Sequence, residues 1–310
     1  MSASLAAILA DIADEITANA AEIEAAADAK EPGLKPGPFG IAVTISAGET
    51  VRAGESHTPF PLQSIAKVFT LELVLAAVGD SIFERVGREP SGDPFNSIVE
   101  LERTTGIPRN PFVNAGALVT VDALLDASDC KESVVDLVQR MLEGAAVPLD
   151  EDVLASEQSA GDLNRAMLSF MRHHGNLRCD PDAVMAAYVE QCAISLDVAG
   201  LSRAGVFLSR TRLDKGEQAR ERAGRMRKLL ALMMTCGHYD GSGDFALRVG
   251  LPAKSGVGGG ILAIMPEVAS IAVWSPNLDQ HGNSILGVRA LEMLAHRTGW
   301  SVFGPPDIAT

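Results

Sequence analysis

Strand-like segments lie near both ends of this chain, and a long block of helical periodicity separates them. The strands are predicted at 41–45, after the turn 47–49, and at 245–249, 260–265 and 269–274. Short strands that are far apart in sequence can bury their apolar faces together only if the chain returns to pair them. The pattern therefore predicts an α/β (α+β) fold with one antiparallel sheet built from both ends, flanked by terminal helices, with a helical domain inserted.

Helical spacing of apolar residues predicts the remaining elements. One amphipathic helix opens the chain over 5–23 and another closes it over about 284–298. The helices between them are predicted at 115–127, 131–143, 160–174, 181–192, 195–209 and 216–236. We therefore expect an α/β domain in two pieces, 1–78 and 237–310, and a helical domain at 79–236.

A serine and a lysine stand one helical turn apart at the start of an apolar helix. Prolines precede this helix, which is predicted over 64–78, and Lys67 would share a face with Ser64. A serine hydroxyl needs a base to take its proton, and a desolvated, neutral lysine can serve. A helix cap followed by a surface lysine is the alternative, and a second Ser-x-x-Lys at 128–131 is interpreted in that way.

Composition excludes several functions. The chain has 26 basic and 40 acidic residues, a net charge of −14, which argues against nucleic acid or an anionic membrane as partner. Its four cysteines form no Cys-x-x-Cys pair and no His-Glu-x-x-His is present, so we expect reduced thiols and no metal site. No apolar run is long enough to cross a membrane, and the N-terminal apolar piece meets acidic residues at once. A cytoplasmic protein is expected.

The stretch from Lys254 to Gly260 is unusually rich in glycine. Its backbone N–H groups could point at an oxyanionic centre, because glycine lets the backbone approach closely. A phosphate-binding loop is disfavoured, since the lysine precedes the glycines and a strand follows them. A glycine-rich strand edge that passes close to a neighbouring segment is the other interpretation.

A few polar residues stand out in this frame. The chain has two tyrosines, of which Tyr239 lies in a turn-rich segment and Tyr188 on a predicted helix. Asn114 lies in a proline-bounded loop, where capping and binding are equally compatible with the pattern. Glu157 and Asn164 are two helical turns apart, which suits gripping an ammonium and a carboxylate, although a solvated face is the commoner outcome.

Together these stretches resemble the serine-dependent glutaminases of the β-lactamase-like fold, the bacterial relatives of kidney-type glutaminase. The resemblance runs from about Phe39 to Gly304 and is carried, in order, by PFPLQSIAKVFTL, REPSGDPFNS, PRNPFVNAGAL, MTCGHYDGSGDFALRVGLPAKSGVGGGILA and VWSPNLDQHGNS. It implies hydrolysis of the L-glutamine side-chain amide to glutamate and ammonia through an acyl-enzyme on Ser64. It also implies no metal or organic cofactor, and a homodimer or homotetramer.

The resemblance also assigns roles by position. Ser64 would be the nucleophile, Lys67 its base, and Tyr239 the phenol that relays a proton to the departing ammonia. The backbone N–H groups of Ser64 and Val257 would form the oxyanion hole, with Lys254 as electrostatic support. Asn114, Glu157, Asn164 and Tyr188 would hold the amino acid head of the substrate. Ser64, Tyr239 and Val257 would also contact the substrate.

Two segments depart from the family pattern. The region 26–33 lacks the tyrosine that the family carries before its first strand, and the segment after Cys192 also diverges. These changes leave the chemistry of Ser64 intact but leave open an altered amide preference. A penicillin-recognising hydrolase and a non-catalytic glutamine-binding protein are the other two classes that the sequence admits.

Overall fold

The computed structural model describes residues 4–31, 33–92, 97–127, 132–210 and 216–304, and only the backbone of residues 157–160. Its α-helices are α1 (Leu5–Ala26), α2 (Ala66–Val78), α3 (Val99–Arg103), α4 (Asn114–Asp126), α5 (Val134–Met141), α6 (Glu151–Ala160), α7 (Asp162–His173), α8 (Pro181–Ala193), α9 (Val198–Gly205), α10 (Glu217–Cys236), α11 (Ser242–Arg248) and α12 (Ile285–Thr298). Its strands are β1 (Gly40–Ile45), β2 (Thr50–Gly54), β3 (Phe60–Pro61), β4 (Ser195–Leu196), β5 (Ala253–Ser255), β6 (Gly260–Met265) and β7 (Ala269–Trp274). Short 3-10 helices lie at Gln63–Ile65, Gly79–Glu84, Val206–Ser209 and Tyr239–Gly241.

Strands from both ends of the chain form one five-stranded antiparallel sheet, as predicted. Its order is β2-β1-β7-β6-β5, so the first strand lies beside the last one. In the middle of the sheet, Ile271 of β7 pairs with Val43 of β1 on one side and with Ala263 of β6 on the other. Strands β3 and β4 form a separate two-stranded pair.

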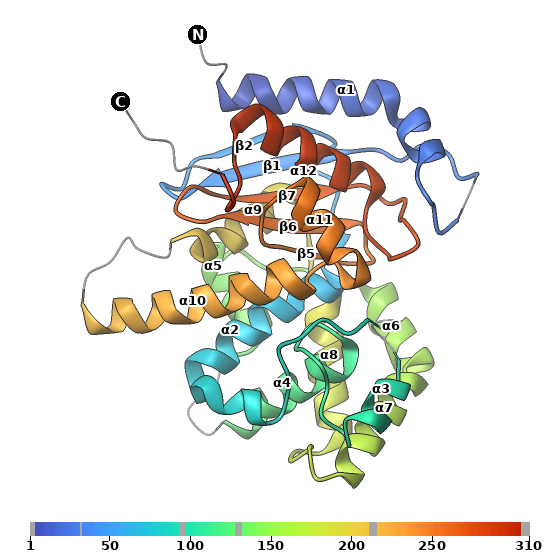
Figure 1. Ribbon diagram of the computed structural model, residues 1–310, viewed down its shortest axis with the longest axis vertical. Helices are drawn as coiled ribbons and strands as arrows, with labels where there is room; N and C mark the ends of the chain where they lie inside the picture. Colours follow the sequence, from blue (N-terminus) through green and yellow to red (C-terminus); the bar gives the residue numbers. More distant parts are fainter. Residues whose placement is uncertain (1–3, 32, 93–96, 128–131, 211–215, 305–310) are drawn as a thin grey trace.

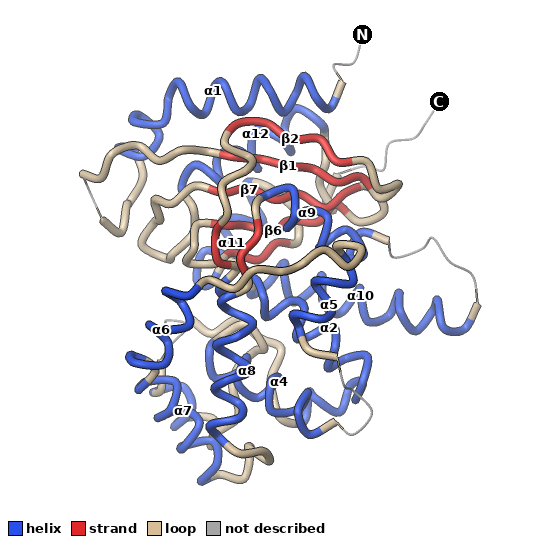
Figure 2. The backbone as a smooth tube through the Cα atoms, turned by 180° about the vertical axis from the view of Figure 1, so that it is seen from behind, coloured by secondary structure: helices blue, strands red, loops and turns tan. Residues whose placement is uncertain are grey.

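Both faces of the sheet are covered, because successive side chains of its central strands point to opposite sides. Ile41 and Val43 belong to the core under α1 and α12, whereas Ala42 between them belongs to the core on the helical side. Figures 1 and 2 show α1 and α12 lying together over one face, with α9 on the other. The Ser202 hydroxyl of α9 contacts the Thr44 hydroxyl of β1 at 2.8 Å.

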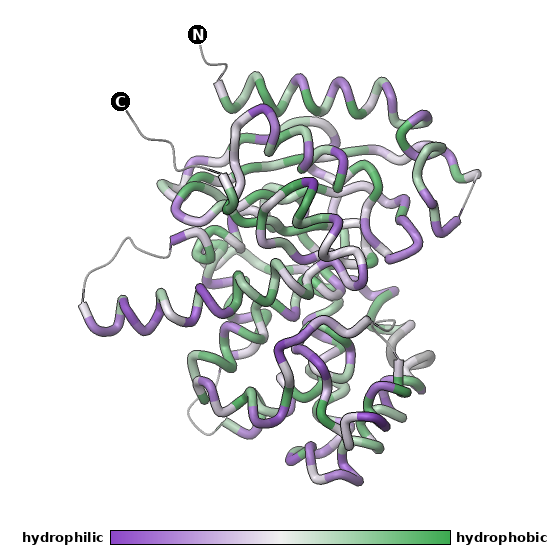
Figure 3. The backbone as a smooth tube through the Cα atoms, viewed as in Figure 1, coloured by the Kyte–Doolittle hydropathy of each residue, from purple (hydrophilic) through white to green (hydrophobic). Residues whose placement is uncertain are grey.

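Helix α2 lies at the centre of the helical side. Every residue from Ala66 to Leu75 is buried, and the helix packs against α4, α8 and α10. A helix that is apolar all round needs neighbours on every side, which α2 has. Figure 3 shows the contrast with α10, whose projecting half is mainly hydrophilic. The nucleophile candidate, Ser64, therefore lies just before a helix that is buried over ten successive residues.

One predicted strand is wrong. The run 245–249 belongs to α11 and the turn that follows it, and the Val249 N–H donates to the Phe245 carbonyl at 2.8 Å. Phe245 and Val249 are both buried, whereas Leu247 between them is 86% exposed. Four-residue spacing of the buried residues is helical, and such a short apolar run does not distinguish helix from strand.

The remaining differences are additions and refinements. Helices α3 and α6 were not predicted, and the helix predicted at 195–209 begins with strand β4 before α9. Helix α9 comes from the middle of the chain but packs on the sheet, so the division at 78/79 and 236/237 stays a prediction. Among the described residues, no helix combines the length and the apolar character that crossing a bilayer requires.

Candidate active site

Ser64 lies in a tight turn between strand β3 and helix α2. The 3-10 turn Gln63–Ile65 places it immediately before the first residue of α2, which confirms the predicted helix start. Gln63 has a φ of +48°, a left-handed conformation that a non-glycine residue rarely adopts. Such conformations persist where the surrounding structure enforces them, and they cluster at functional sites. The turn leaves Ser64 buried, at 6% exposure.

Lys67 is fully buried one turn further along α2. Its Nζ donates to the Asn114 Oδ1 at 2.8 Å and to the Phe112 carbonyl at 3.1 Å. The loop that carries both acceptors is shaped by Asn110, whose Oδ1 accepts from the N–H groups of Phe112 and Val113 at 2.9 and 3.1 Å. Asn110 is thus a structural turn residue, whereas Asn114 contacts the lysine.

Three of the four residues predicted to hold an amino acid head lie together beside this lysine. Asn114 Nδ2 donates to Asn164 Oδ1 at 3.2 Å, and the Tyr188 hydroxyl donates to Asn114 Oδ1 at 3.5 Å. They come from the N-terminus of α4, the first turn of α7 and the middle of α8. The fourth, Glu157, belongs to helix α6, and its side chain lies outside the described residues.

Tyr239 comes from the segment after α10 and contacts the Ser64 side chain. It lies in the 3-10 turn after α10 with a φ of +54°, in the left-handed region like Gln63. Burial raises the pKa of Tyr239 to about 12, although hydrogen bonds with the side chains of Ser64 and Ser255 lower the pKa in part. The phenol therefore keeps its proton at neutral pH and lies between two hydroxyl groups.

Lys254 lies directly behind Tyr239. Its Nζ is 4.3 Å from the centroid of the Tyr239 ring and donates to the carbonyl oxygens of Gly237 at 3.1 Å and Ser255 at 2.6 Å. Burial, and then the charge of nearby Lys67, lowers the pKa of Lys254 well below its usual value. The positive charge of Lys67 therefore disfavours a second positive charge on Lys254.

The glycine-rich stretch forms a tight hairpin turn between β5 and β6, with Val257 at its tip. The Gly256 N–H donates to the Gly260 carbonyl at 2.9 Å, and the Gly259 N–H donates to the Gly256 carbonyl at 3.0 Å. A Cβ atom on Gly256 would lie 2.5 Å from the Leu62 carbonyl oxygen, so only glycine allows this approach. The loop therefore lies directly against the segment that leads into Ser64, in agreement with the interpretation of a close backbone approach.

The two N–H groups predicted to form an oxyanion hole have no acceptor among the described residues. Neither the Ser64 N–H nor the Val257 N–H makes a backbone or side-chain hydrogen bond within the described part of the chain. Val257 is 36% exposed at the tip of the loop. Donors without an internal partner are what a developing oxyanion requires, because it can then accept from both.

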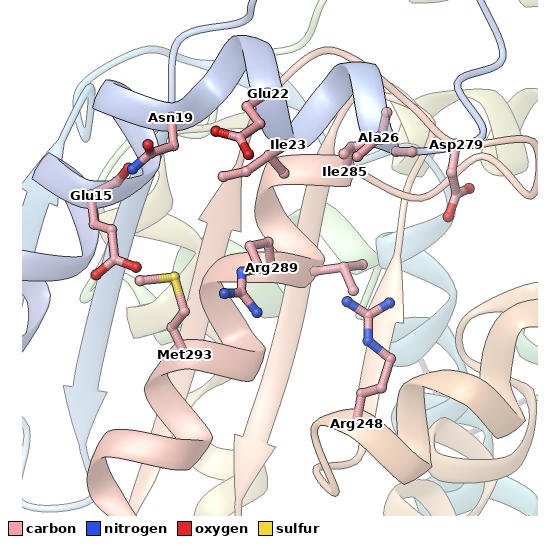
Figure 4. A pocket seen from close by; sticks show the side chains of 12 residues that line it. Glu15, Asn19, Glu22, Ile23, Ala26, Arg248, Asp279, Ile285, Arg289 and Met293 are labelled. Carbon is pink, nitrogen blue, oxygen red and sulfur yellow. The ribbon is translucent and has the colours of Figure 1, made fainter.

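Cavity volume does not locate these residues. A cavity of about 610 Å³ lies between α1 and α12. Figure 4 shows Glu15, Glu22, Arg248 and Arg289 around it. None of the predicted site residues lines that cavity. Tyr239 borders a hollow of only about 10 Å³, the room of roughly one water molecule. The site is identified by its hydrogen bonds and its buried lysine side chains, not by its size.

Sequence reasoning missed two polar groups of this site. The Phe112 carbonyl accepts from Lys67, and the Ser255 hydroxyl contacts Tyr239. Both residues stand inside stretches that carry the family resemblance, next to Asn114 and Lys254. Their positions in those stretches were the available signal, but a backbone carbonyl and a small hydroxyl have no distinctive pattern of their own.

Comparison with known proteins agrees with this geometry. The sequence model of the glutaminase family matches residues 31–303. A curated glutaminase of Agrobacterium fabrum is 52% identical over 277 residues, which cover 87% of this chain and 89% of the relative.

Solved structures give the same result. The structure of a probable glutaminase, ybaS, superposes with a TM-score of 0.81 at 34% identity, covering 96% of this chain and 99% of that one. The Bacillus subtilis glutaminase YbgJ, solved as a covalent complex with 5-oxo-L-norleucine, gives 0.78 at 26% identity over 97% and 100%. The neighbours confirm the predicted β-lactamase-like fold. The family match, the close relatives and the arrangement around Ser64 lead to one conclusion: this chain belongs to the glutaminase family of enzymes.

Proposed function

We propose that the protein hydrolyses the side-chain amide of L-glutamine to L-glutamate and ammonia through an acyl-enzyme on Ser64. The observation that carries the proposal is the hydrogen bond from Lys67 to Asn114 at 2.8 Å. Asn114 also contacts Asn164 and Tyr188, so the proposed base and the proposed grip on the amino acid head are parts of one network. A relative of this chain, the YbgJ glutaminase, has been solved in covalent complex with a product of 6-diazo-5-oxo-L-norleucine.

In the acylation step, Ser64 Oγ attacks the amide carbon of glutamine while its proton passes to Lys67. Lys67 Nζ donates to the Phe112 carbonyl and to Asn114 Oδ1, and we propose that the amine reacts in its neutral form, which has a lone pair. In this mechanism the lone pair accepts the serine proton. The carbonyl oxygen becomes an oxyanion that accepts from the N–H groups of Ser64 and Val257, which carry no competing acceptor within the described residues.

Breakdown of the tetrahedral intermediate requires a proton on the leaving nitrogen. Tyr239 remains a phenol at neutral pH because burial raises its pKa to about 12. It can receive the proton held by Lys67 and pass its own to the nitrogen, so that ammonia leaves and the ester on Ser64 remains. Water then attacks the ester carbon, its proton follows the reverse route, and glutamate is released as Ser64 Oγ regains its proton.

Specificity for a free amino acid follows from the residues on α4, α6, α7 and α8. Asn114, Asn164 and Tyr188 supply amide and phenol groups, and Glu157, whose side chain lies outside the described residues, supplies the negative charge in the proposal. A ligand without the α-ammonium would leave that carboxylate unpaired, and a buried unpaired charge is costly.

The decisive experiment compares ammonia release by the wild type, Ser64→Ala and a control, Ser81→Ala, whose serine lies on the exposed turn after α2. We expect the wild type and the control to hydrolyse glutamine, and Ser64→Ala to lose activity by at least about 10⁴-fold. Asparagine, a γ-glutamyl amide and a chromogenic β-lactam are tested as alternative substrates of the same proteins. Equal rates from wild type and Ser64→Ala would overturn the acyl-enzyme, and β-lactam turnover without glutamine turnover would change the substrate class.

A homodimer or homotetramer in the cytoplasm is part of the same proposal. Phe303 and Leu247 are 70% and 86% exposed, and an apolar groove of about 650 Å³ runs along α10 beside Phe303. Exposed apolar surface of this kind is typical of contact areas between proteins. Light scattering on purified protein would settle the assembly, and a single-chain mass at all concentrations would contradict it.

A further inference from the structure

The two proposed oxyanion donors belong to separate segments that touch through their backbones. A Cβ atom on Gly258 would lie 2.4 Å from the Pro61 carbonyl oxygen, and one on Gly260 would lie 2.3 Å from the ring of Phe60. The loop that carries Val257 is therefore packed against the segment that ends at Ser64. Glycine-rich backbone has wide conformational freedom, so this packing alone does not fix the direction of the Val257 N–H.

One side chain contacts both segments. Trp274 ends strand β7, and its indole Nε1 donates to the Gly258 carbonyl at 3.0 Å. The same indole stacks on the ring of Phe60, with centroids 5.9 Å apart and an interplanar angle of 12°. Phe60 lies in β3, four residues before Ser64. Trp274 thus holds the glycine loop by a hydrogen bond and the serine segment by ring stacking.

We propose that Trp274 is a positioning residue for the oxyanion hole. It would hold the Val257 N–H so that this group and the Ser64 N–H point at the same substrate oxygen. The inference rests on the oxyanion role proposed above for these two groups. An oxyanion donor works when it lies about 2.7–3.1 Å from the oxygen it stabilises, so a loop that drifts by a fraction of an ångström loses much of the effect. The hydrogen bond from Trp274 to the Gly258 carbonyl restricts the movement of the loop at the residue next to Val257.

A purely structural role for Trp274 predicts different results. Trp274 is 8% exposed and belongs to the core on the helical side of the sheet. As a simple core residue, its replacement would lower the free energy of unfolding and would affect substrate binding and turnover together. As a positioning residue, loss of the indole N–H alone would lower kcat and leave KM nearly unchanged, because the oxyanion exists only in the transition state.

The test uses two replacements of Trp274 in the full chain. Trp274→Phe keeps an aromatic ring without the N–H, and benzothienylalanine at the same position keeps the indole shape with sulfur in place of the N–H. We expect both to lower kcat for glutamine by about 10- to 100-fold, with KM and glutamate affinity changed by less than about twofold. The benzothienylalanine protein should unfold within about 5 °C of the wild type, because it loses one hydrogen bond but keeps the packing of the ring.

Trp300→Phe is the matched control, because Trp300 packs on the other core, beyond the opposite face of the sheet, and should keep wild-type kcat. Wild-type kcat in the benzothienylalanine protein would overturn the inference, as would a parallel loss of kcat and glutamate affinity. Ser64→Ala, measured alongside, separates the two proposals. If Ser64→Ala is inactive and benzothienylalanine has no effect, the acyl-enzyme stands and only the role of Trp274 fails.

Discussion

Asn114 accepts a hydrogen bond from the buried amine of Lys67, with 2.8 Å between Oδ1 and Nζ. The sequence placed Asn114 with the substrate-binding residues and Lys67 with the serine. The structure shows them in direct contact, so the charge of the side chain at position 114 should affect the protonation of the Lys67 amine.

Asn114→Asp should shift the pH dependence of kcat upward. A carboxylate at this position favours the protonated amine, and the proposed base works only when neutral. We expect the acid limb of the kcat profile to move up by about 1–3 pH units, so activity is lost at neutral pH and regained in alkali. Asn19→Asp, on the exposed surface of α1, adds the same charge as a control. A lower rate with an unshifted profile would contradict the prediction.

The two tyrosines should respond differently to loss of their hydroxyl groups. Tyr239→Phe removes the phenol between Ser64 and Ser255 but keeps the ring under Lys254. We expect kcat to fall by about 100- to 10,000-fold. Tyr188→Phe removes a hydroxyl that lies 3.5 Å from Asn114 Oδ1, among the proposed substrate-binding residues, and should mainly raise KM. Steady-state kinetics with glutamine distinguish them, and similar kcat values in both variants would argue against the proton relay.

Gly258→Ala should lower kcat by more than about 10-fold, because its Cβ would lie 2.4 Å from the Pro61 carbonyl oxygen and push the loop from the serine segment. The cost in the free energy of unfolding should be about 1–3 kcal/mol. Gly243→Ala, in α11, meets nothing within 4 Å and should leave kcat unchanged. Urea unfolding and kinetics on both proteins check this, and equal losses of kcat would refute it.

Glu72→Gln should make folding less sensitive to pH. Burial raises the pKa of Glu72 to about 7, although the nearby Arg225 guanidinium lowers it. Glu72 Oε2 and Arg225 Nε are both buried without a partner among the described residues. Because the folded-state pKa lies above the ordinary 4.5, the folded state binds this proton more tightly.

The stability from that proton is complete below pH 4.5 and is lost as the pH rises through about 7. The variant should therefore match the wild type near pH 5 and exceed its free energy of unfolding by about 1–2 kcal/mol near pH 8. Urea midpoints at the two pH values measure this. A difference that does not change with pH would count against the buried carboxyl as its source.

Much of the fold follows from the sequence pattern. Strands β1, β6 and β7 and helix α12 carry long apolar or periodic runs, and their expected positions agree with the structure. Residues 245–249 were predicted as a strand because five residues cannot separate a two-residue period from a helical one. Helix α6 was missed because its sequence, EDVLASEQSA, has little apolar periodicity.

The roles of the site residues stay predictions, but two of their contacts are now described. The resemblance pointed to Ser64, Lys67, Tyr239 and Asn114, and the structure shows Lys67 bonded to Asn114 and Tyr239 in contact with Ser64. No sequence rule predicts that an asparagine at a helix start will accept from a lysine on another helix, since that contact depends on packing. The role of Glu157 stays a prediction, because its side chain lies outside the described residues.

The pairing of β1 with β7 has a consequence for synthesis. On the ribosome, β1 emerges early, but its partner in the middle of the sheet appears only near the end of translation. Until then the nascent chain carries an exposed strand edge and the apolar α2 without its full cover, a state that invites aggregation and chaperone binding. A message cut before residue 269 would yield a chain in which β1 has β2 alone as a partner, so truncated products of this gene should accumulate as insoluble protein.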